Sequence, residues 1–217
     1  MAEQRALAGL VLAASLVAGI SYVASWQMDL PPLAAMAWKG AGVALLAAYA
    51  GLRARSADGW LICAVMAFGA LGDVLLEAAG LTVGAVAFLI GHLIAIGLYW
   101  RNRRPRITGA DKLLAAALIA GTAGLAWLLP ADRSLGAAAA LYSLGLATMA
   151  SAAWISRFPR ALVGLGALMF VVSDLLIFAR AGPLAQAAWV GLAIWGLYYF
   201  GQALICFGVV RALSRRA

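Results

Sequence analysis

Residues 81–106 read LTVGAVAFLIGHLIAIGLYW followed by RNRRPR, an apolar run that ends at a cluster of arginines. The first 20 of these residues include no Asp, Glu, Lys or Arg. A transmembrane helix needs about 20 apolar residues, and strands cross lipid only as closed barrels. The stretch therefore predicts a membrane-spanning helix with the arginines at its cytoplasmic end.

The composition extends this prediction to the whole chain. Of 217 residues, 66% are hydrophobic and 11% are charged, whereas soluble domains carry about 25% charged residues. The polar surface is too small to cover a water-exposed protein, which excludes disordered, collagen-like, disulfide-rich and soluble enzyme classes. We expect an integral membrane protein of the bacterial inner membrane.

Charged residues, Pro and Gly divide the chain into eight apolar segments, which predicts an all-α, polytopic fold of eight transmembrane helices. We expect one transmembrane domain over residues 1–217, with the first segment retained rather than removed as a signal peptide. The predicted helices are 6–26, 31–52, 60–79, 81–100, 112–130, 135–156, 161–180 and 184–213.

The basic residues predict the orientation of the chain. With the N-terminus inside, thirteen of them fall on the inner side, whereas only Arg133 and Arg180 fall outside, and Lys39 lies within the second helix. This asymmetry places both termini in the cytoplasm. The net charge of +8 is thus a topology signal and a contact to anionic lipid, not a sign of nucleic-acid binding. The inner residues are Arg5, Arg53, Arg55, Arg101, Arg103, Arg104, Arg106, Lys112, Arg157, Arg160, Arg211, Arg215 and Arg216.

Two aspartates lie in similar surroundings. The sequence GDVLL at 72–76 resembles SDLLI at 173–177, which suggests two parallel four-helix repeats, 1–104 and 105–217, although chance is the alternative for so short a match. Each aspartate follows the predicted inner helix end by 13 residues, roughly 20 Å into a core of about 30 Å. Asp73 and Asp174 should therefore lie at the same depth, in the outer half of the membrane.

Charged groups within a bilayer are costly, roughly 2.5–3.5 kcal/mol each on insertion scales, and usually functional. The two aspartates are the strongest catalytic candidates, and Asp73 shares a helix face with Glu77 four residues later. The other candidates, for substrate binding or support, are Lys39, Glu77, His92, Tyr142, Ser173, Tyr198, Tyr199 and Gln202.

Most of these supporting residues also have a purely structural interpretation. Lys39 could pair with an aspartate or reach toward water, Glu77 could simply be hydrated, and His92 could be a hydrogen-bonded core residue. Ser173 could bond to the preceding turn of its own helix. Three further side chains could join neighbouring helices: Tyr198, Tyr199 and Gln202.

Several kinds of site have no signature in the sequence. A single histidine, two separate cysteines (Cys63 and Cys206) and no HExxH motif argue against a zinc hydrolase. Neither a GxSxG motif nor a glycine-rich phosphate loop is present. We expect no metal and no cofactor, which leaves acid–base chemistry between carboxyl groups, or ion movement past them.

At these residues the sequence resembles the YhhN family of membrane proteins, the lysoplasmalogenases. Gly40 after the lysine, where the family often has proline, and Ala95, where it often has an aromatic residue, depart from the pattern. The matching residues, in order, are Lys39, GDVLL at 72–76, Phe88 with His92, Tyr142 with Met149, Phe170 with Ser173 and Asp174, and Tyr198 and Tyr199 with Gln202.

The resemblance implies hydrolysis of the vinyl ether of a lysoplasmalogen, without a recognised redox cofactor, to a fatty aldehyde and glycerophospho-ethanolamine or -choline. It also implies that Asp73 and Asp174 form the active centre, with a lysophospholipid as the binding partner. Two carboxyl groups suit this reaction, because one protonates the vinyl ether and the other stabilises the resulting cation, as in glycosidases. A small proton-coupled transporter using the aspartate pair is the alternative, and a structural membrane subunit is a third hypothesis.

Overall fold

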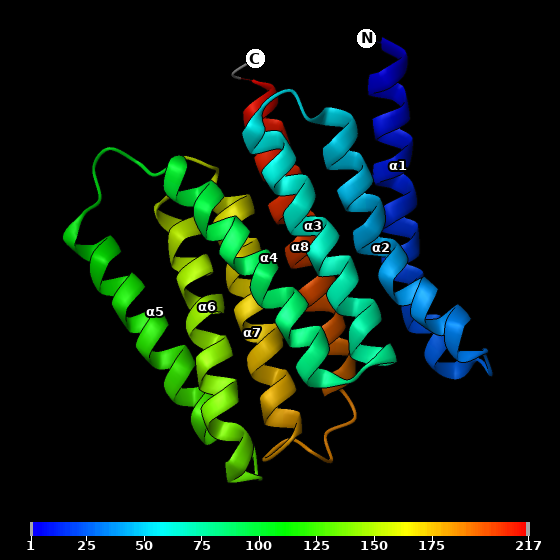
Figure 1. Ribbon diagram of the computed structural model, residues 1–217, viewed down its shortest axis with the longest axis vertical. Coiled ribbons are helices and arrows are strands. Elements are labelled where there is room, and N and C mark those ends of the chain that lie inside the picture. Colours follow the sequence, from blue (N-terminus) through cyan, green and yellow to red (C-terminus); the bar gives the residue numbers. More distant parts are fainter. Residues whose placement is uncertain (1, 216–217) are drawn as a thin grey trace. The chain divides into compact units, whose positions relative to one another are not determined.

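The computed structural model describes residues 2–215, so Arg216 of the predicted inner cluster lies outside the described residues. Helix makes up 84% of the structure, and the described part of the chain contains no strand. Within it, eight helices are long and apolar enough to cross a membrane. The predicted all-α, eight-helix membrane fold is thereby confirmed (Figure 1).

The helices follow the predicted order along the chain, with short 3-10 or π segments beside three of them. They are α1 (Ala2–Ser21), η1 (Tyr22–Gln27), α2 (Pro32–Arg53), α3 (Ala57–Ala78), α4 (Leu81–Arg101), α5 (Gly109–Leu128), η2 (Arg133–Leu135), α6 (Gly136–Ile155), η3 (Arg160–Gly164), α7 (Leu165–Arg180) and α8 (Val190–Ser214).

Polar capping residues move two helix starts three residues upstream of the predicted ones. Ser56 precedes α3 and its side chain accepts a hydrogen bond from the backbone N–H of Gly59. Thr108 precedes α5 and forms a capping box with Asp111. These side chains satisfy N–H groups that have no partner within the helix, so each helix begins at its cap rather than at its first apolar residue.

The predicted start of the last helix at residue 184 is wrong, because α8 begins at Val190. The preceding segment forms turns instead, in which the backbone N–H groups of Gly182 and Leu184 both donate to the Ala179 carbonyl oxygen. Pro183 lies between them and has no N–H to donate to a helix. The apolar composition predicted a helix in this segment, but the proline and the turn hydrogen bonds around it give the backbone a turn conformation instead.

The chain forms two compact units, one comprising the residues up to Ala95 together with those from Val209, the other Ile96–Gly208. In the first unit, α2 packs against both α1 and α3 (Figure 1). Hydrogen bonds join these helices: Ser15 Oγ donates to the Gly42 carbonyl oxygen at 2.7 Å, and Cys63 Sγ lies 3.3 Å from that of Ala47. The fully buried apolar side chains include Val43, Leu46, Ile62 and Met66.

In the second unit, α6 packs against α5 and α7, and α7 lies directly on α8. At the contact between α7 and α8, a Cβ on Gly166 would lie 2.6 Å from the Gly201 carbonyl oxygen, and one on Gly201 would lie 2.8 Å from that of Gly166. No side chain fits between the two backbones, a packing mode common among membrane helices.

This contact predicts that Gly201→Ala destabilises the protein, whereas Gly196→Ala does not. The added Cβ at 201 should lower the free energy of unfolding by about 1–3 kcal/mol through overpacking. Residue 196 of the same helix has nothing within 4 Å of the corresponding position, and alanine there should be neutral or stabilising by up to about 1 kcal/mol. Thermal unfolding in detergent measures both, and equal melting temperatures for the two variants would contradict the contact.

Candidate functional site

Helix α3 carries two of the predicted site residues in very different environments. Asp73 is 1% exposed, whereas the Glu77 side chain is 49% exposed. Four residues separate them, so both project from the same helix face. The helix therefore presents one carboxyl inside the protein and another, one turn later, at its surface.

Lys39 of α2 pairs with Glu77 rather than with an aspartate. Its Nζ donates to Glu77 Oε1 at 2.6 Å, so Glu77 is both exposed and ion-paired rather than merely hydrated. The adjacent Gly40 permits this approach of α2 to α3, since a Cβ there would lie 2.8 Å from Cγ2 of Val74. The departure from the family pattern at residue 40 thus occurs at a tight helix–helix contact.

Gly72, the residue before Asp73, allows α4 to pack closely against α3. A Cβ on Gly72 would lie 2.7 Å from the ring of Phe88, which belongs to α4. The glycine therefore lets the aromatic ring lie against the α3 backbone. His92, one turn after Phe88 on α4, is 4% exposed. Asp73 and His92, the two buried polar residues predicted in this unit, therefore lie on two helices that are in contact here.

In the second unit, Asp174 of α7 accepts a hydrogen bond from a neighbouring helix. The Tyr142 hydroxyl of α6 donates to its Oδ2 at 2.6 Å, within the range of a strong hydrogen bond to a carboxyl group. Asp174 is 5% exposed, and the Tyr142 ring packs edge-on against Phe178 at a centroid separation of 6.4 Å. The carboxyl is thus buried, with one of its oxygens held in a fixed direction.

Ser173 donates its hydrogen bond to α8. The alternative that it bonds to the preceding turn of its own helix is therefore wrong. Its Oγ donates to the Ile194 carbonyl oxygen at 3.0 Å. One turn earlier, Phe170 meets Tyr198 with ring centroids 5.2 Å apart. Together with the Gly166–Gly201 contact, these pairs show that α7 and α8 run antiparallel, with residues 194, 198 and 201 facing α7.

The remaining predicted residues of α8 are buried. Tyr198 is 6%, Tyr199 1% and Gln202 3% exposed. The Trp195 ring stacks on Tyr199 at a centroid distance of 6.0 Å and lies 5.6 Å from Tyr198. Two pairs within the predicted set are joined by hydrogen bonds, Lys39 with Glu77 in the first unit and Tyr142 with Asp174 in the second.

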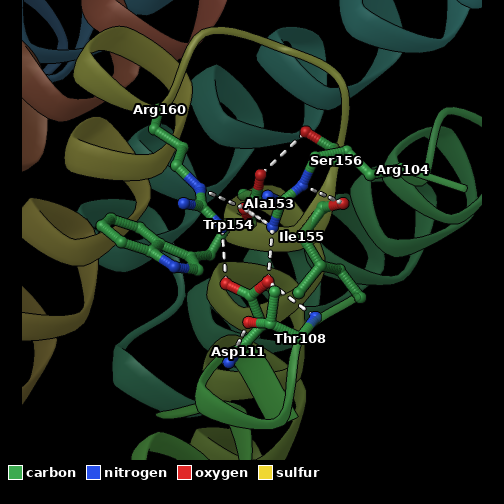
Figure 2. Close-up of polar contacts among 8 residues, drawn as sticks. All are labelled: Arg104, Thr108, Asp111, Ala153, Trp154, Ile155, Ser156 and Arg160. Atoms are coloured by element: carbon green, nitrogen blue, oxygen red, sulfur yellow. Dashed lines mark hydrogen bonds and ion pairs between the residues drawn. The ribbon is translucent and has the colours of Figure 1, made fainter. Parts of the chain in front are cut away.

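A polar cluster that the sequence analysis did not single out lies in the second unit, around Asp111 of α5 (Figure 2). Its Oδ2 accepts from Arg104 Nη2 at 3.1 Å and its Oδ1 from Arg160 Nη2 at 2.5 Å. The backbone N–H of Thr108 donates to Oδ2 at 3.1 Å. One carboxylate thus holds the arginines that follow α4 and precede α7.

The same arginines also bind the end of α6. Arg104 Nε donates to the Ile155 carbonyl oxygen at 3.2 Å, and Arg160 Nε donates to that of Trp154 at 3.1 Å. The Arg160 guanidinium also lies 4.9 Å from the centre of the Trp154 ring, a cation–π contact. Unsatisfied helix-end carbonyls are in this way paired with cations, so we assign the cluster a structural role. Its sequence signal is the Thr108-x-x-Asp111 capping pattern.

Among the residues described, no group of three His, Cys, Asp or Glu side chains is arranged to hold a metal ion. Asp73 and Asp174 are the buried carboxyl groups of the predicted set, at 1% and 5% exposure.

Comparison with known proteins identifies one family. The model of the YhhN family matches residues 34–209, which includes every predicted site residue. No curated protein and no solved structure matches the chain.

The Asp111 cluster predicts that Asp111→Ala lowers the thermal unfolding temperature in detergent, whereas Lys112→Ala leaves it nearly unchanged. The first change removes the acceptor shared by two arginines, and the second truncates an exposed side chain on the next position of the same helix. Asp111→Ala melting together with the wild type would contradict a structural role for the cluster.

Proposed function

The chain belongs to the YhhN family, and we propose that it is a membrane hydrolase that cleaves the vinyl-ether bond of lysoplasmalogens. The products are a fatty aldehyde and glycerophosphoethanolamine or glycerophosphocholine. The observation that carries the proposal is the presence of two carboxyl groups, Asp73 and Asp174, buried in apolar helices at 1% and 5% exposure. Such burial is costly and usually functional.

The reaction requires an acid and an electrostatic partner. Protonation of the β-carbon of the vinyl ether creates an oxocarbenium ion, to which water adds to form a hemiacetal. The hemiacetal collapses to the aldehyde and the free glycerol hydroxyl, and the proton lost by the added water replaces the one consumed. No electrons are exchanged. One carboxyl group supplies the proton, and the other, ionised, stabilises the cation and activates water.

The contacts within each unit support a catalytic use of the carboxyls. Tyr142 occupies Oδ2 of Asp174, which leaves the other carboxyl oxygen for a reacting group. Asp73 follows Gly72, where α3 and the Phe88 ring are in close contact. Groups held in fixed orientations away from water stabilise a developing charge without reorganising.

A lysolipid substrate also explains why the chemistry lies within membrane helices. The single alkenyl chain of the substrate lies among lipid chains, and its headgroup remains at the interface. We propose that the protein lies in the bacterial inner membrane with both termini in the cytoplasm; the distribution of basic residues along the sequence supports that orientation.

The proposal predicts that the purified protein releases aldehyde from a vinyl-ether lysolipid and that Asp73→Asn and Asp174→Asn each abolish the release. Asparagine keeps the shape of the side chain but can neither donate a carboxylic proton nor carry a negative charge. Mass spectrometry of the aldehyde measures turnover, and the saturated alkyl-ether analogue, which has no double bond to protonate, is the substrate control.

Undiminished turnover in both asparagine variants would refute the mechanism. Proton or solute flux in liposomes without any aldehyde would refute the hydrolase and favour a proton-coupled transporter. Folding of each variant is checked by its elution from gel filtration and its unfolding temperature, so that loss of structure is not counted as loss of chemistry.

A second prediction concerns Tyr142 as a positioning residue. Tyr142→Phe removes the hydroxyl that holds Asp174 and should lower kcat by roughly tenfold or more, the effect of one lost hydrogen bond to a charged group, with KM unchanged. The matched control is Tyr99→Phe, since the Tyr99 hydroxyl is buried with no hydrogen-bond partner in the described structure. Equal kcat values for the two variants would contradict the role of Tyr142.

A further inference from the structure

The ion pair at the end of α3 lies one helical turn after the buried Asp73, and the three charged side chains differ in exposure. Asp73 is 1% exposed, the Lys39 side chain 15% and the Glu77 side chain 49%. All three belong to the first compact unit. Exposure thus increases from the buried Asp73 through the mostly buried Lys39 to Glu77 at the surface.

Stability alone does not account for this pair. Exposed ion pairs contribute little to folding, and Glu77 is about half exposed. Lys39, by contrast, lies in the eighth position of a 22-residue apolar helix, where an ammonium group is costly. Ionisable groups within membrane helices often mark a substrate pathway, which makes the Lys39–Glu77 pair a candidate recognition site.

We propose that Lys39 and Glu77 form the headgroup receptor of the lysolipid, with Lys39 binding the phosphate and Glu77 the ammonium of a phosphoethanolamine or phosphocholine group. This inference rests on the proposed function, because it takes the lysolipid as the molecule bound. It identifies the two side chains that select the zwitterionic headgroup of that substrate.

The spacing along α3 matches the spacing within the lipid. Asp73 and Glu77 are four residues apart, which is about 6 Å along the helix axis. In a lysoplasmalogen, five bonds separate the vinyl-ether oxygen from the phosphorus atom. An extended chain advances 3.3–3.6 Å per three bonds, so that this separation is also about 6 Å. A vinyl ether beside Asp73 therefore places its phosphate at the level of the ion pair.

The order of the charges matches as well. From the interior outward, a lysolipid presents its ether, then its phosphate and then its ammonium group. The protein presents Asp73, then Lys39 and then Glu77 in order of increasing exposure. A zwitterionic headgroup would exchange the single Lys39–Glu77 pair for two pairs, with no net charge added to the site.

Headgroups without an amine are disfavoured by the same arrangement. A lipid that ends in a bare phosphate brings two negative charges to a site whose outer residue is the Glu77 carboxylate. An uncharged alkylglycerol contacts neither member of the pair through charge. The receptor should therefore bind phosphoethanolamine lipids more tightly than bare phosphate lipids, and Glu77 should account for the difference.

The test measures binding without hydrolysis. The full-length protein in nanodiscs is titrated with three saturated ether lysolipids, whose heads are phosphoethanolamine, phosphate alone, or the free glycerol hydroxyl. The wild type should bind the first about tenfold more tightly than the second. Glu77→Gln should abolish that difference, and Lys39→Met should weaken both phosphate lipids about tenfold while leaving the alkylglycerol unchanged.

Two controls separate recognition from structure. Asp58→Asn neutralises a carboxylate at the opposite end of α3 and should leave all three affinities unchanged. The variants Lys39→Arg and Glu77→Asp keep both charges and should keep the order of affinities, which tests the inference even if the neutral variants fail to fold.

Two results would overturn the inference: a wild type that binds the three lipids equally, or variants that weaken all three by the same factor. Failure of the proposed function is distinguishable from either. If the vinyl-ether lysolipid releases no aldehyde while the predicted headgroup pattern holds, the receptor assignment stands and the hydrolase does not.

Discussion

Backbone hydrogen bonding in the absence of water is the constraint on which the rest of this structure depends. In lipid each peptide group must find its partner within the protein, so the described membrane-spanning segments are helical, and some helices begin at caps such as Thr108. The same medium penalises every charge left inside. Few charged groups therefore lie within the membrane-spanning helices. Those that do either form a strong contact or are buried at a cost that indicates a function.

Close contacts between helices fix the positions of the few polar side chains. Gly166 and Gly201 let α7 and α8 touch, which fixes the register that brings Ser173 to Ile194. Gly40 similarly lets α2 approach α3 beside Lys39. Small residues thus set the positions of the polar side chains, because between membrane helices packing replaces the hydrophobic effect as the main source of specificity.

Carboxyl groups of this protein take three roles according to what surrounds them. Asp111 holds two arginines at the helix ends and is structural. Glu77 pairs with one cation, Lys39, at the surface of the protein. Asp73 and Asp174 are buried, and Tyr142 fixes the direction of the latter. All of these side chains carry a carboxyl group, and the number and charge of the neighbouring groups distinguish one from another.

The sequence by itself determined the fold class, the number and order of the helices and the candidate carboxyls, since hydropathy and the cost of buried charge are local properties readable along the chain. Only the tertiary structure decided that Lys39 pairs with Glu77, that Ser173 bonds to α8 and that Asp111 binds Arg104 and Arg160. These partners lie 38, 21, 7 and 49 residues apart in the chain, and which of them meet depends on helix rotation and register, which no periodicity encodes.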